Sequence, residues 1–287
     1  MAIRSINGVD FANIRNLNES PIGQNVSISD VPIEGIVTDG LRYWLDARYG
    51  YSYSGSGTTW FDLREYTGSP DMALVNTPIW SGSGSPRYFE LDGTTDGMNT
   101  TPTGSYFFIS QSGNVGASNS GITVSIWFKF VTSPLFLDTI FASIYQASGS
   151  TSGASFFMDC RNTTQNAVGG FAYGHLRNSD FASVIYNRTH TTGVWVNMCG
   201  TTNFTTPKSA SMTLYENAIS RISGVRTTPN FTWADFNWIS SSFEIGNLSS
   251  AFNRRPNIQV GQVLIYNRAL TSTEVLQNFS ASRDYYR

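Results

Sequence analysis

The fold is decided by one stretch near the end of the chain, Gly261-Gln262-Val263-Leu264-Ile265-Tyr266-Asn267-Arg268-Ala269-Leu270-Thr271-Ser272-Thr273-Glu274-Val275-Leu276. Its residues 263–266 form a β-branched and aromatic run bounded by turn formers, which predicts a buried strand. Thr271 and Glu274 have the spacing of a capping box, in which a hydroxyl and a carboxylate each accept a backbone N–H that the first helical turn leaves free. The stretch therefore predicts a strand, a tight turn and a short closing helix. The apolar residues predicted on one face of that helix are Val275, Leu276 and Phe279.

Most of the remaining chain consists of short apolar runs separated by turn residues. Residues 122–130 alternate most clearly, and Trp127, on the face opposite Val124 and Ile126, indicates that both sides of this strand are covered. Further strands are predicted at residues 41–47, 72–75, 87–91, 139–145, 155–160, 168–173, 181–186, 194–199, 212–215 and 243–245. Strands this short and frequent predict an antiparallel two-sheet sandwich.

Four stretches in a fixed order carry a resemblance to a known family: residues 41–47, 54–63, 88–93 and the closing stretch quoted above. The chain resembles the LamG-like, concanavalin A-type jelly-roll domains over roughly residues 38–285. The resemblance implies an all-β, antiparallel two-sheet jelly-roll sandwich with a short C-terminal helix. Ser-Gly-Ser-Gly-Thr-Thr-Trp at 54–60 and Thr-Glu-Val-Leu-Gln-Asn-Phe at 273–279 are most similar to domains on virion proteins of tailed bacteriophages. This similarity implies a place on a virus particle.

Composition narrows the classes of partner. The chain has 287 residues, of which 40% are hydrophobic and only 13% charged, and its net charge of -2 provides no electrostatic footprint for nucleic acid or anionic lipid. No apolar run approaches the ~18 residues of a membrane span, and the N-terminus does not read as a signal peptide. We therefore expect synthesis in the host cytoplasm and location in the virion. Cys160 and Cys199 are predicted to be buried free thiols.

The first 37 residues differ from the rest. Their apolar residues are scattered among Asn, Ser and Gly, so the segment cannot bury much surface alone. We divide the chain into an N-terminal arm, residues 1–37, and a jelly-roll domain, residues 38–287. One interpretation is an extended arm that orders against other virion proteins, and the alternative is an arm packed on its own domain or a frayed leader. The candidate anchoring residues are Ile3, Ile6, Val9, Phe11, Ile14 and Leu17.

Carbohydrate binding is the activity that the resemblance most directly implies. Sugar recognition uses an aromatic surface and a few polar groups that fix orientation. Tyr49, Tyr51 and Tyr53 alternate in a loop and are predicted to face one way. Trp233 and Trp238 provide a second candidate surface within residues 220–240, which we interpret as an insertion. The alternative for both groups is packing on the sandwich or on a neighbouring subunit.

Calcium is a further candidate ligand, because domains of the resembled family often hold this ion with carboxylates and backbone carbonyls. Many relatives carry an acidic pair just before the last core strand, where this chain has Gly261 and Gln262. The remaining candidate metal ligands are Asp46, Asp62 and Asp92, each of which can instead cap a turn.

Catalysis has little support in the sequence. Glycoside hydrolysis needs two carboxylates flanking the scissile bond, and the nearest approach is Glu90 and Asp92, of which Asp92 reads as part of an Asp-Gly turn. His175 and His190 are predicted to have surface or hydrogen-bonding roles. We therefore predict that the chain is not an enzyme.

Two functions follow from these observations. The first is a structural protein of a tailed-bacteriophage virion, on the capsid, a head fibre, the tail or the baseplate, whose lectin-like jelly roll adheres to host surface glycan. The alternative is a dedicated receptor-recognition lectin at a fibre tip. Both functions leave open whether the chain forms a homo-oligomer. Loss of glycan affinity in Tyr51→Ala or Trp233→Ala would favour the receptor-recognition lectin.

Overall fold

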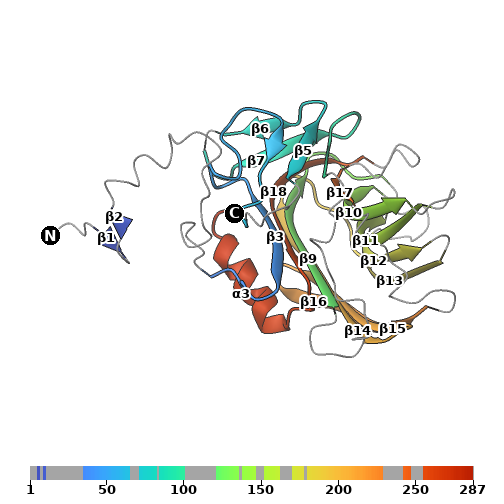
Figure 1. Cartoon of the computed structure of the whole chain (residues 1–287). Helices are drawn as coiled ribbons and strands as arrows, with labels where there is room; N and C mark the ends of the chain where they lie inside the picture. Colours follow the sequence, from blue (N-terminus) through green and yellow to red (C-terminus); the bar gives the residue numbers. More distant parts are fainter. Residues whose placement is uncertain are drawn as a thin grey trace.

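The computed structural model describes residues 5–6, 9–10, 35–64, 71–82, 84–100, 121–135, 138–146, 152–161, 170–177, 180–228, 242–246 and 255–286. Within these ranges, two antiparallel sheets face each other, and one helix packs on the outer face of one of them (Figure 1). The predicted all-β sandwich with a short C-terminal helix is confirmed. No helix among the described residues is long and apolar enough to span a membrane.

The sheet that carries the helix, here the helix-side sheet, is built around β18 (Asn257–Tyr266). One edge of β18 pairs with β9 along most of its length, and the other edge pairs first with β7 and then with β3. The remaining strands extend the sheet outward in the order β16-β15-β14-β9 on one side and β7-β6 on the other. The bounds are β3 (Leu41–Asp46), β6 (Ile79–Ser81), β7 (Tyr88–Asp92), β9 (Gly121–Phe130), β14 (Trp195–Thr206), β15 (Ser209–Glu216) and β16 (Ile219–Thr227).

The opposite sheet has the order β13-β12-β11-β10-β17-β8-β5-β4. Its strands are β4 (Thr59–Trp60), β5 (Met72–Val75), β8 (Gly97–Asn99), β10 (Thr139–Gln146), β11 (Ser152–Arg161), β12 (Gly170–Arg177), β13 (Asp180–Tyr186) and β17 (Ser242–Ile245). Two further strands, β1 (Ser5–Ile6) and β2 (Val9–Asp10), pair with each other and with no other described strand.

The core lies between the two sheets and is rich in aromatic side chains. Phe89 and Phe128 of the helix-side sheet face inward, as do Phe141 and Phe171 of the opposite sheet, and all four are almost fully buried. Their neighbours in the sequence point outward, because successive side chains in a strand alternate between faces. Trp127 follows this rule: it faces the helix and stacks on Phe279 with ring centroids 5.5 Å apart.

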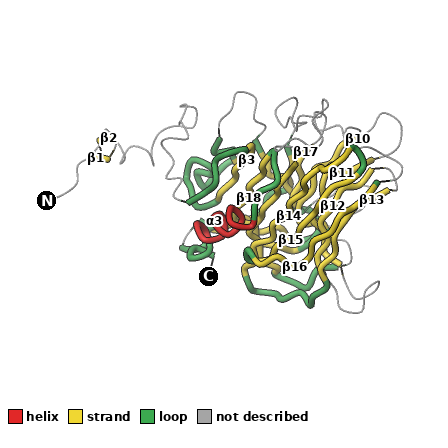
Figure 2. The backbone as a smooth tube through the Cα atoms, turned by 90° about the horizontal axis from the view of Figure 1, so that it is seen from below, coloured by secondary structure: helices red, strands yellow, loops and turns green. Residues whose placement is uncertain are grey.

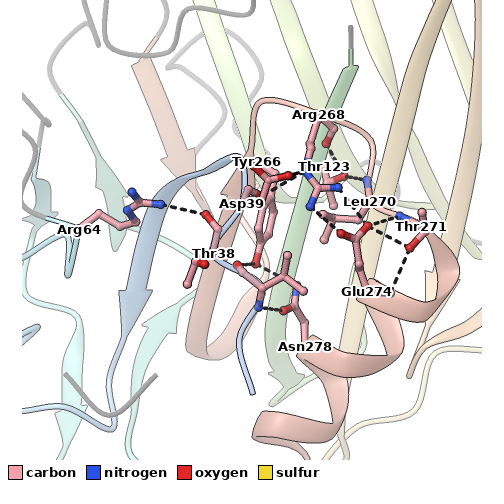
Figure 3. A network of polar contacts seen from close by, with 11 residues as sticks. Thr38, Asp39, Arg64, Thr123, Tyr266, Arg268, Leu270, Thr271, Glu274 and Asn278 are labelled. Carbon is pink, nitrogen blue, oxygen red and sulfur yellow. Dashed lines mark hydrogen bonds and ion pairs between the residues drawn. The ribbon is translucent and has the colours of Figure 1, made fainter. Parts of the chain in front are cut away.

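Helix α3 (Ser272–Ser282) lies against β18 on the outer face of the helix-side sheet (Figure 2). The capping box that begins it is present as predicted, with the Thr271 hydroxyl accepting from the Glu274 N–H. Arg268 donates to both Glu274 carboxylate oxygens, at 3.0 and 2.6 Å, and Thr123 of β9 donates to the Arg268 carbonyl at 2.8 Å (Figure 3). The turn after β18 is therefore fastened both to the helix and to the neighbouring strand.

A second set of bonds fixes the middle of the helix. The Asn278 amide accepts from the Val37 N–H and donates to the Tyr266 hydroxyl, each at 2.9 Å, and that hydroxyl donates to the Val37 carbonyl at 2.9 Å. All three residues are buried. Here the chain before β3, the end of β18 and α3 are joined in one closed loop of hydrogen bonds (Figure 3).

Several predictions need correction. Residues 220–227 were assigned to an insertion, but Ile219–Thr227 forms β16, hydrogen-bonded to β15 along its length. Leu276 was placed on the buried helix face with Val275, yet Leu276 is 51% exposed and Val275 only 2%. The short strands β4, β6 and β8 were not predicted. The predicted free and buried thiols of Cys160 and Cys199 are confirmed.

Other predictions lie outside the described residues. Among the candidate anchoring residues these are Ile3, Phe11, Ile14 and Leu17, together with the side chains of Ile6 and Val9. Trp233 and Trp238 lie outside as well. The division into an arm, residues 1–37, and a domain, residues 38–287, stays a prediction.

Candidate functional site

An aromatic surface with a cation at its centre lies on the outer face of the helix-side sheet. The rings of Tyr88 and Trp195 are 5.8 Å apart between centroids, and the Lys129 ammonium lies 5.6 Å from the first and 5.4 Å from the second. All three side chains are partly exposed. We call these residues, together with Glu90 and Gln259, the aromatic platform.

The platform is assembled by strand register. Glu90 on β7 pairs with Gln259 on β18, Gln259 pairs with Lys129 on β9, and Lys129 pairs with Trp195 on β14. Residues that are direct partners across a sheet lie on the same face. The row therefore crosses four neighbouring strands, and its members face away from the core.

Gly261 makes room beside this row. A side chain at this position would collide with the ring of Tyr286, which lies directly over the glycine. The Tyr286 ring is stacked on Trp127 and also meets Trp195, in each case with centroids 4.9 Å apart. Burial raises the pKa of Tyr286 well above its ordinary value, and the nearby Asp46 charge adds to this effect. The C-terminal residues thus form a fixed aromatic wall at one end of the platform.

The polar groups of the platform are incompletely paired within the described chain. Gln259 donates from its amide nitrogen to a Glu90 carboxylate oxygen at 2.6 Å. The amide oxygen of Gln259 is buried and accepts no hydrogen bond from any described residue. Lys129 forms no ion pair within the described part of the chain. A bound polar molecule could donate a hydrogen bond to the Gln259 amide oxygen and accept one from the Lys129 ammonium.

The predicted tyrosine surface takes a different form. Residues 49–53 form turns, with the Ser52 and Tyr53 N–H groups both donating to the Tyr49 carbonyl, so strand-like alternation does not apply. Tyr53 enters the core between Trp80 and Phe89, and its hydroxyl donates to the Gly57 carbonyl. Tyr49 and Tyr51 are half-buried against the cluster beneath α3. The three rings do not share one open face, and whether Tyr49 or Tyr51 contacts sugar stays a prediction.

The three candidate calcium ligands are occupied by protein donors. Asp46 is fully buried and accepts from Arg48 at 2.5 Å and from the Gln262 amide at 2.7 Å. Asp62 accepts the backbone N–H groups of residues 44 and 64. Asp92 accepts three backbone N–H groups of residues 94–96, which confirms the predicted turn. Among the described residues, no three or more His, Cys, Asp or Glu residues form a group that could hold a metal ion, and whether Asp46, Asp62 or Asp92 binds calcium stays a prediction.

The two histidines have interior or packing roles. His175 is fully buried, and its Nε2 shares a 2.9 Å hydrogen bond with the Thr202 hydroxyl, which also bonds the Tyr173 hydroxyl at 2.9 Å. This cluster joins β12 to β14 across the space between the sheets. His190 lies edge-on to Phe171 with centroids 4.7 Å apart. The hydrogen-bonding role predicted for His175 is confirmed, and the surface location is not.

Sequence reasoning missed the aromatic platform, although one signal was present. Lys129 is the only charged residue within the apolar strand 122–130, and it lies two positions after the outward-facing Trp127. When a strand is buried on both faces, a charged residue within it indicates where one face becomes accessible to solvent. The sequence does not contain the strand register, however, so the residues that lie beside Lys129 on neighbouring strands could not be identified.

Comparisons with known proteins agree with this architecture. A family model described as the concanavalin A-like lectin/glucanases superfamily matches residues 92–276. No curated protein matches the chain. Among solved structures, the chain is similar to the binding domain of Paraclostridial Mosquitocidal Protein 1, with 15% identity, a TM-score of 0.56, and coverage of 85% of this chain and 52% of that one. The receptor binding domain of botulinum neurotoxin C/D mosaic serotype has 16% identity, a TM-score of 0.55 and the same two coverages.

The solved structures also include enzymes. Trypanosoma rangeli sialidase, in complex with 2,3-difluoro-KDN, has 13% identity and a TM-score of 0.55, with coverage of 87% of this chain and 33% of that one. The chain thus spans about a third of the sialidase and about half of the toxin domains.

Our prediction that the chain is not an enzyme is contradicted by this comparison. The fold is shared with sialidases. Neither the lectin-like sandwich nor the lack of a recognisable pair of catalytic carboxylates in the sequence is therefore a ground for excluding catalysis. Likeness at this level of identity concerns the fold alone. It assigns no reaction to the aromatic platform.

Proposed function

We propose that this chain, which belongs to the concanavalin A-like lectin/glucanases superfamily, binds carbohydrate through the aromatic platform. The observation that carries the proposal is the position of the Lys129 ammonium between two partly exposed rings, beside a buried amide oxygen with no described donor. Ligand sites commonly combine an apolar aromatic surface with a few fixed polar groups. The platform has both.

The chemistry of a sugar matches these parts. A pyranose has an apolar C–H face, which packs on an aromatic ring, and hydroxyls around its rim, which donate and accept hydrogen bonds. Trp195 provides the ring. The Gln259 amide oxygen accepts a hydroxyl, and Lys129 donates to another oxygen. Because the rings are held by Tyr286 and by strand register, little side-chain freedom is lost on binding.

The named relatives support a recognition role by analogy only. Two of the similar structures are described as a receptor binding domain and a binding domain of toxins. Fold-level likeness does not carry a site, so the argument rests on the platform residues.

The test is a glycan array of bacterial polysaccharides, followed by titration of each hit. Trp195→Ala is expected to weaken binding about tenfold or more, in line with the loss of a central aromatic contact. The matched control is Tyr186→Ala, because Tyr186 also carries a cation over its ring, Arg221 at 5.5 Å, but lies on β13 in the opposite sheet. Unchanged binding by Trp195→Ala would overturn the platform as the site. Loss in Tyr51→Ala or Trp233→Ala instead would move the site to the surfaces predicted from sequence.

We also propose that the chain is a structural component of a tailed-bacteriophage virion and that the bound glycan is on the host surface. The support is the similarity of residues 54–60 and 273–279 to domains on virion proteins of tailed bacteriophages. In this proposal residues 1–37 hold the domain to other virion proteins. The alternative is a dedicated receptor lectin at a fibre tip.

Mass spectrometry of purified virions separates these possibilities. A copy number like that of the major capsid protein indicates capsid decoration, and one like that of tail proteins indicates a tail component or fibre. Particles that lack the protein would overturn the virion proposal. Particles assembled with a chain lacking residues 1–37 are expected to lose the domain, while a point variant of the platform is retained.

A further inference from the structure

Lys129 differs from four arginines that lie at the surface of the described sandwich. Each of these four arginines meets a carboxylate: Arg48 pairs with Asp46, Arg268 with Glu274, and both Arg188 and Arg221 with Glu216. Lys129 instead faces two aromatic rings and has no carboxylate within ion-pair distance among the described residues. The two rings therefore hold the Lys129 ammonium in place, but no described carboxylate neutralises its charge.

The one carboxylate of the platform, Glu90, forms no ion pair with Lys129. Glu90 is two strands from Lys129, with Gln259 between them, which places their Cα atoms on the order of 10 Å apart at ~4.8 Å per strand. Glu90 is also tied to the Gln259 amide nitrogen at 2.6 Å. The platform thus has a positive end at Trp195 and a negative end at Glu90.

We infer that the platform selects an anionic sugar, whose carboxylate or phosphate group pairs with Lys129 while its ring packs on Trp195. This inference rests on the proposed carbohydrate-binding function. The two rings exclude water from one side of the ammonium, so an ion pair formed there is screened less than a pair on an open surface. An anion at the other end would meet Glu90 and be repelled, so the acidic group has one allowed position.

Gln259 fixes the orientation between these ends. Its amide nitrogen is committed to Glu90, which leaves the buried amide oxygen as an acceptor only. A sugar hydroxyl can donate to it, whereas a carboxylate or phosphate oxygen cannot. The middle of the platform therefore accepts a neutral part of the sugar, and the anionic group is directed to Lys129.

The experiment uses the full chain and an array on which each bacterial polysaccharide is printed in native, carboxyl-reduced and dephosphorylated forms. Wild-type protein is expected to bind at least one native acidic form about tenfold more tightly than its neutralised counterpart. The form whose neutralisation removes binding tells whether the group is a carboxylate or a phosphate. Added salt is expected to weaken binding of the native form more than that of the neutralised form.

Two variants make the test specific. Lys129→Met is expected to lose the preference, because binding of the native form falls more than binding of the neutralised form, and Lys129→Arg is expected to keep the preference. Thermal unfolding checks that both variants fold. Equal binding of native and neutralised forms, with both lost in Trp195→Ala, would overturn the anionic selectivity and leave the proposed function standing. An array with no binding of any form would overturn the proposed function itself.

Discussion

Two regions on the outer face of the same sheet differ in how completely their polar groups are paired. The helix network, which comprises Thr123, Tyr266, Arg268, Glu274 and Asn278, has each side chain bonded to another part of the chain (Figure 3). The aromatic platform leaves the Gln259 amide oxygen and the Lys129 ammonium without such partners among the described residues. Buried polar groups in native proteins are usually paired, so an unpaired one needs an explanation.

The difference separates a structural role from a binding role. The helix network closes the fold by joining the end of β18, the chain before β3 and α3. Among the described residues, none of its side chains has a buried polar atom without a partner. The platform is equally well positioned by its strands, yet its polar groups gain a partner only from outside. Changes in the first region should therefore alter stability, and changes in the second should alter binding.

The largest expected effect is in the helix network. Asn278→Ala removes the acceptor of the buried Val37 N–H and the donor to the Tyr266 hydroxyl, which leaves polar groups buried and unpaired. We expect a loss of about 2–3 kcal/mol in the free energy of unfolding, measured in urea. The control is Gln277→Ala, an exposed position on the same helix. A loss in Asn278→Ala no greater than in this control would show that the network is not what holds α3 in place.

The next effect is a dependence on pH from the same region. The bonds from Arg268 hold the pKa of Glu274 at about 2, below its ordinary value of 4.5. Because the folded pKa is the lower one, this stabilisation is complete above pH 4.5 and is lost as the pH falls from 4.5 toward 2. For a partly exposed pair we expect a loss on the order of 2 kcal/mol relative to Glu274→Gln. Parallel stability curves of the two proteins across this range would contradict the prediction.

The sequence predicted the helix network far better than the platform, and the reason is distance along the chain. Thr271 and Glu274 interact within one helical turn, so their spacing alone specifies the capping box. The alternation of residues 122–130 likewise specifies which face is buried. Lys129 and Trp195 become neighbours only through the register of β9 and β14, which local patterns do not contain.

The errors have local causes as well. The hairpin into β16 turns at Asn217 and Ala218, both with positive φ, a geometry for which a Gly would have been the usual sign. Without it, the largely exposed strand that follows was assigned to an insertion. Tyr53 was predicted to face the same way as Tyr49 and Tyr51 because the three alternate in the sequence, but the turns in this segment direct Tyr53 into the core.

A smaller change in the free energy of unfolding is expected at the platform, and the sign of this change tests the comparison. Gln259→Met removes a buried acceptor that has no described donor and keeps the length of the side chain. It also removes the amide donor to Glu90, which water can replace because Glu90 is partly exposed. We expect the free energy of unfolding to stay the same or to rise by up to about 1 kcal/mol, while glycan binding weakens. Urea unfolding and array binding measure the two quantities on one variant. A loss of more than about 1 kcal/mol would show that the Gln259 amide oxygen is paired in the folded protein and that the contrast between the two regions is wrong.

The smallest effect is expected at Leu276, on the helix but outside its network. The side chain is 51% exposed, so Leu276→Ser should change the free energy of unfolding by no more than about 0.5 kcal/mol. Val275→Ser is the matched variant, and because Val275 is only 2% exposed it should lose several times as much. A large loss in Leu276→Ser would mean that this face of α3 is covered in solution, by a second copy or by chain outside the described ranges. The helix would then present two buried faces, and the outer side of the sheet would be an interface as well as a binding surface.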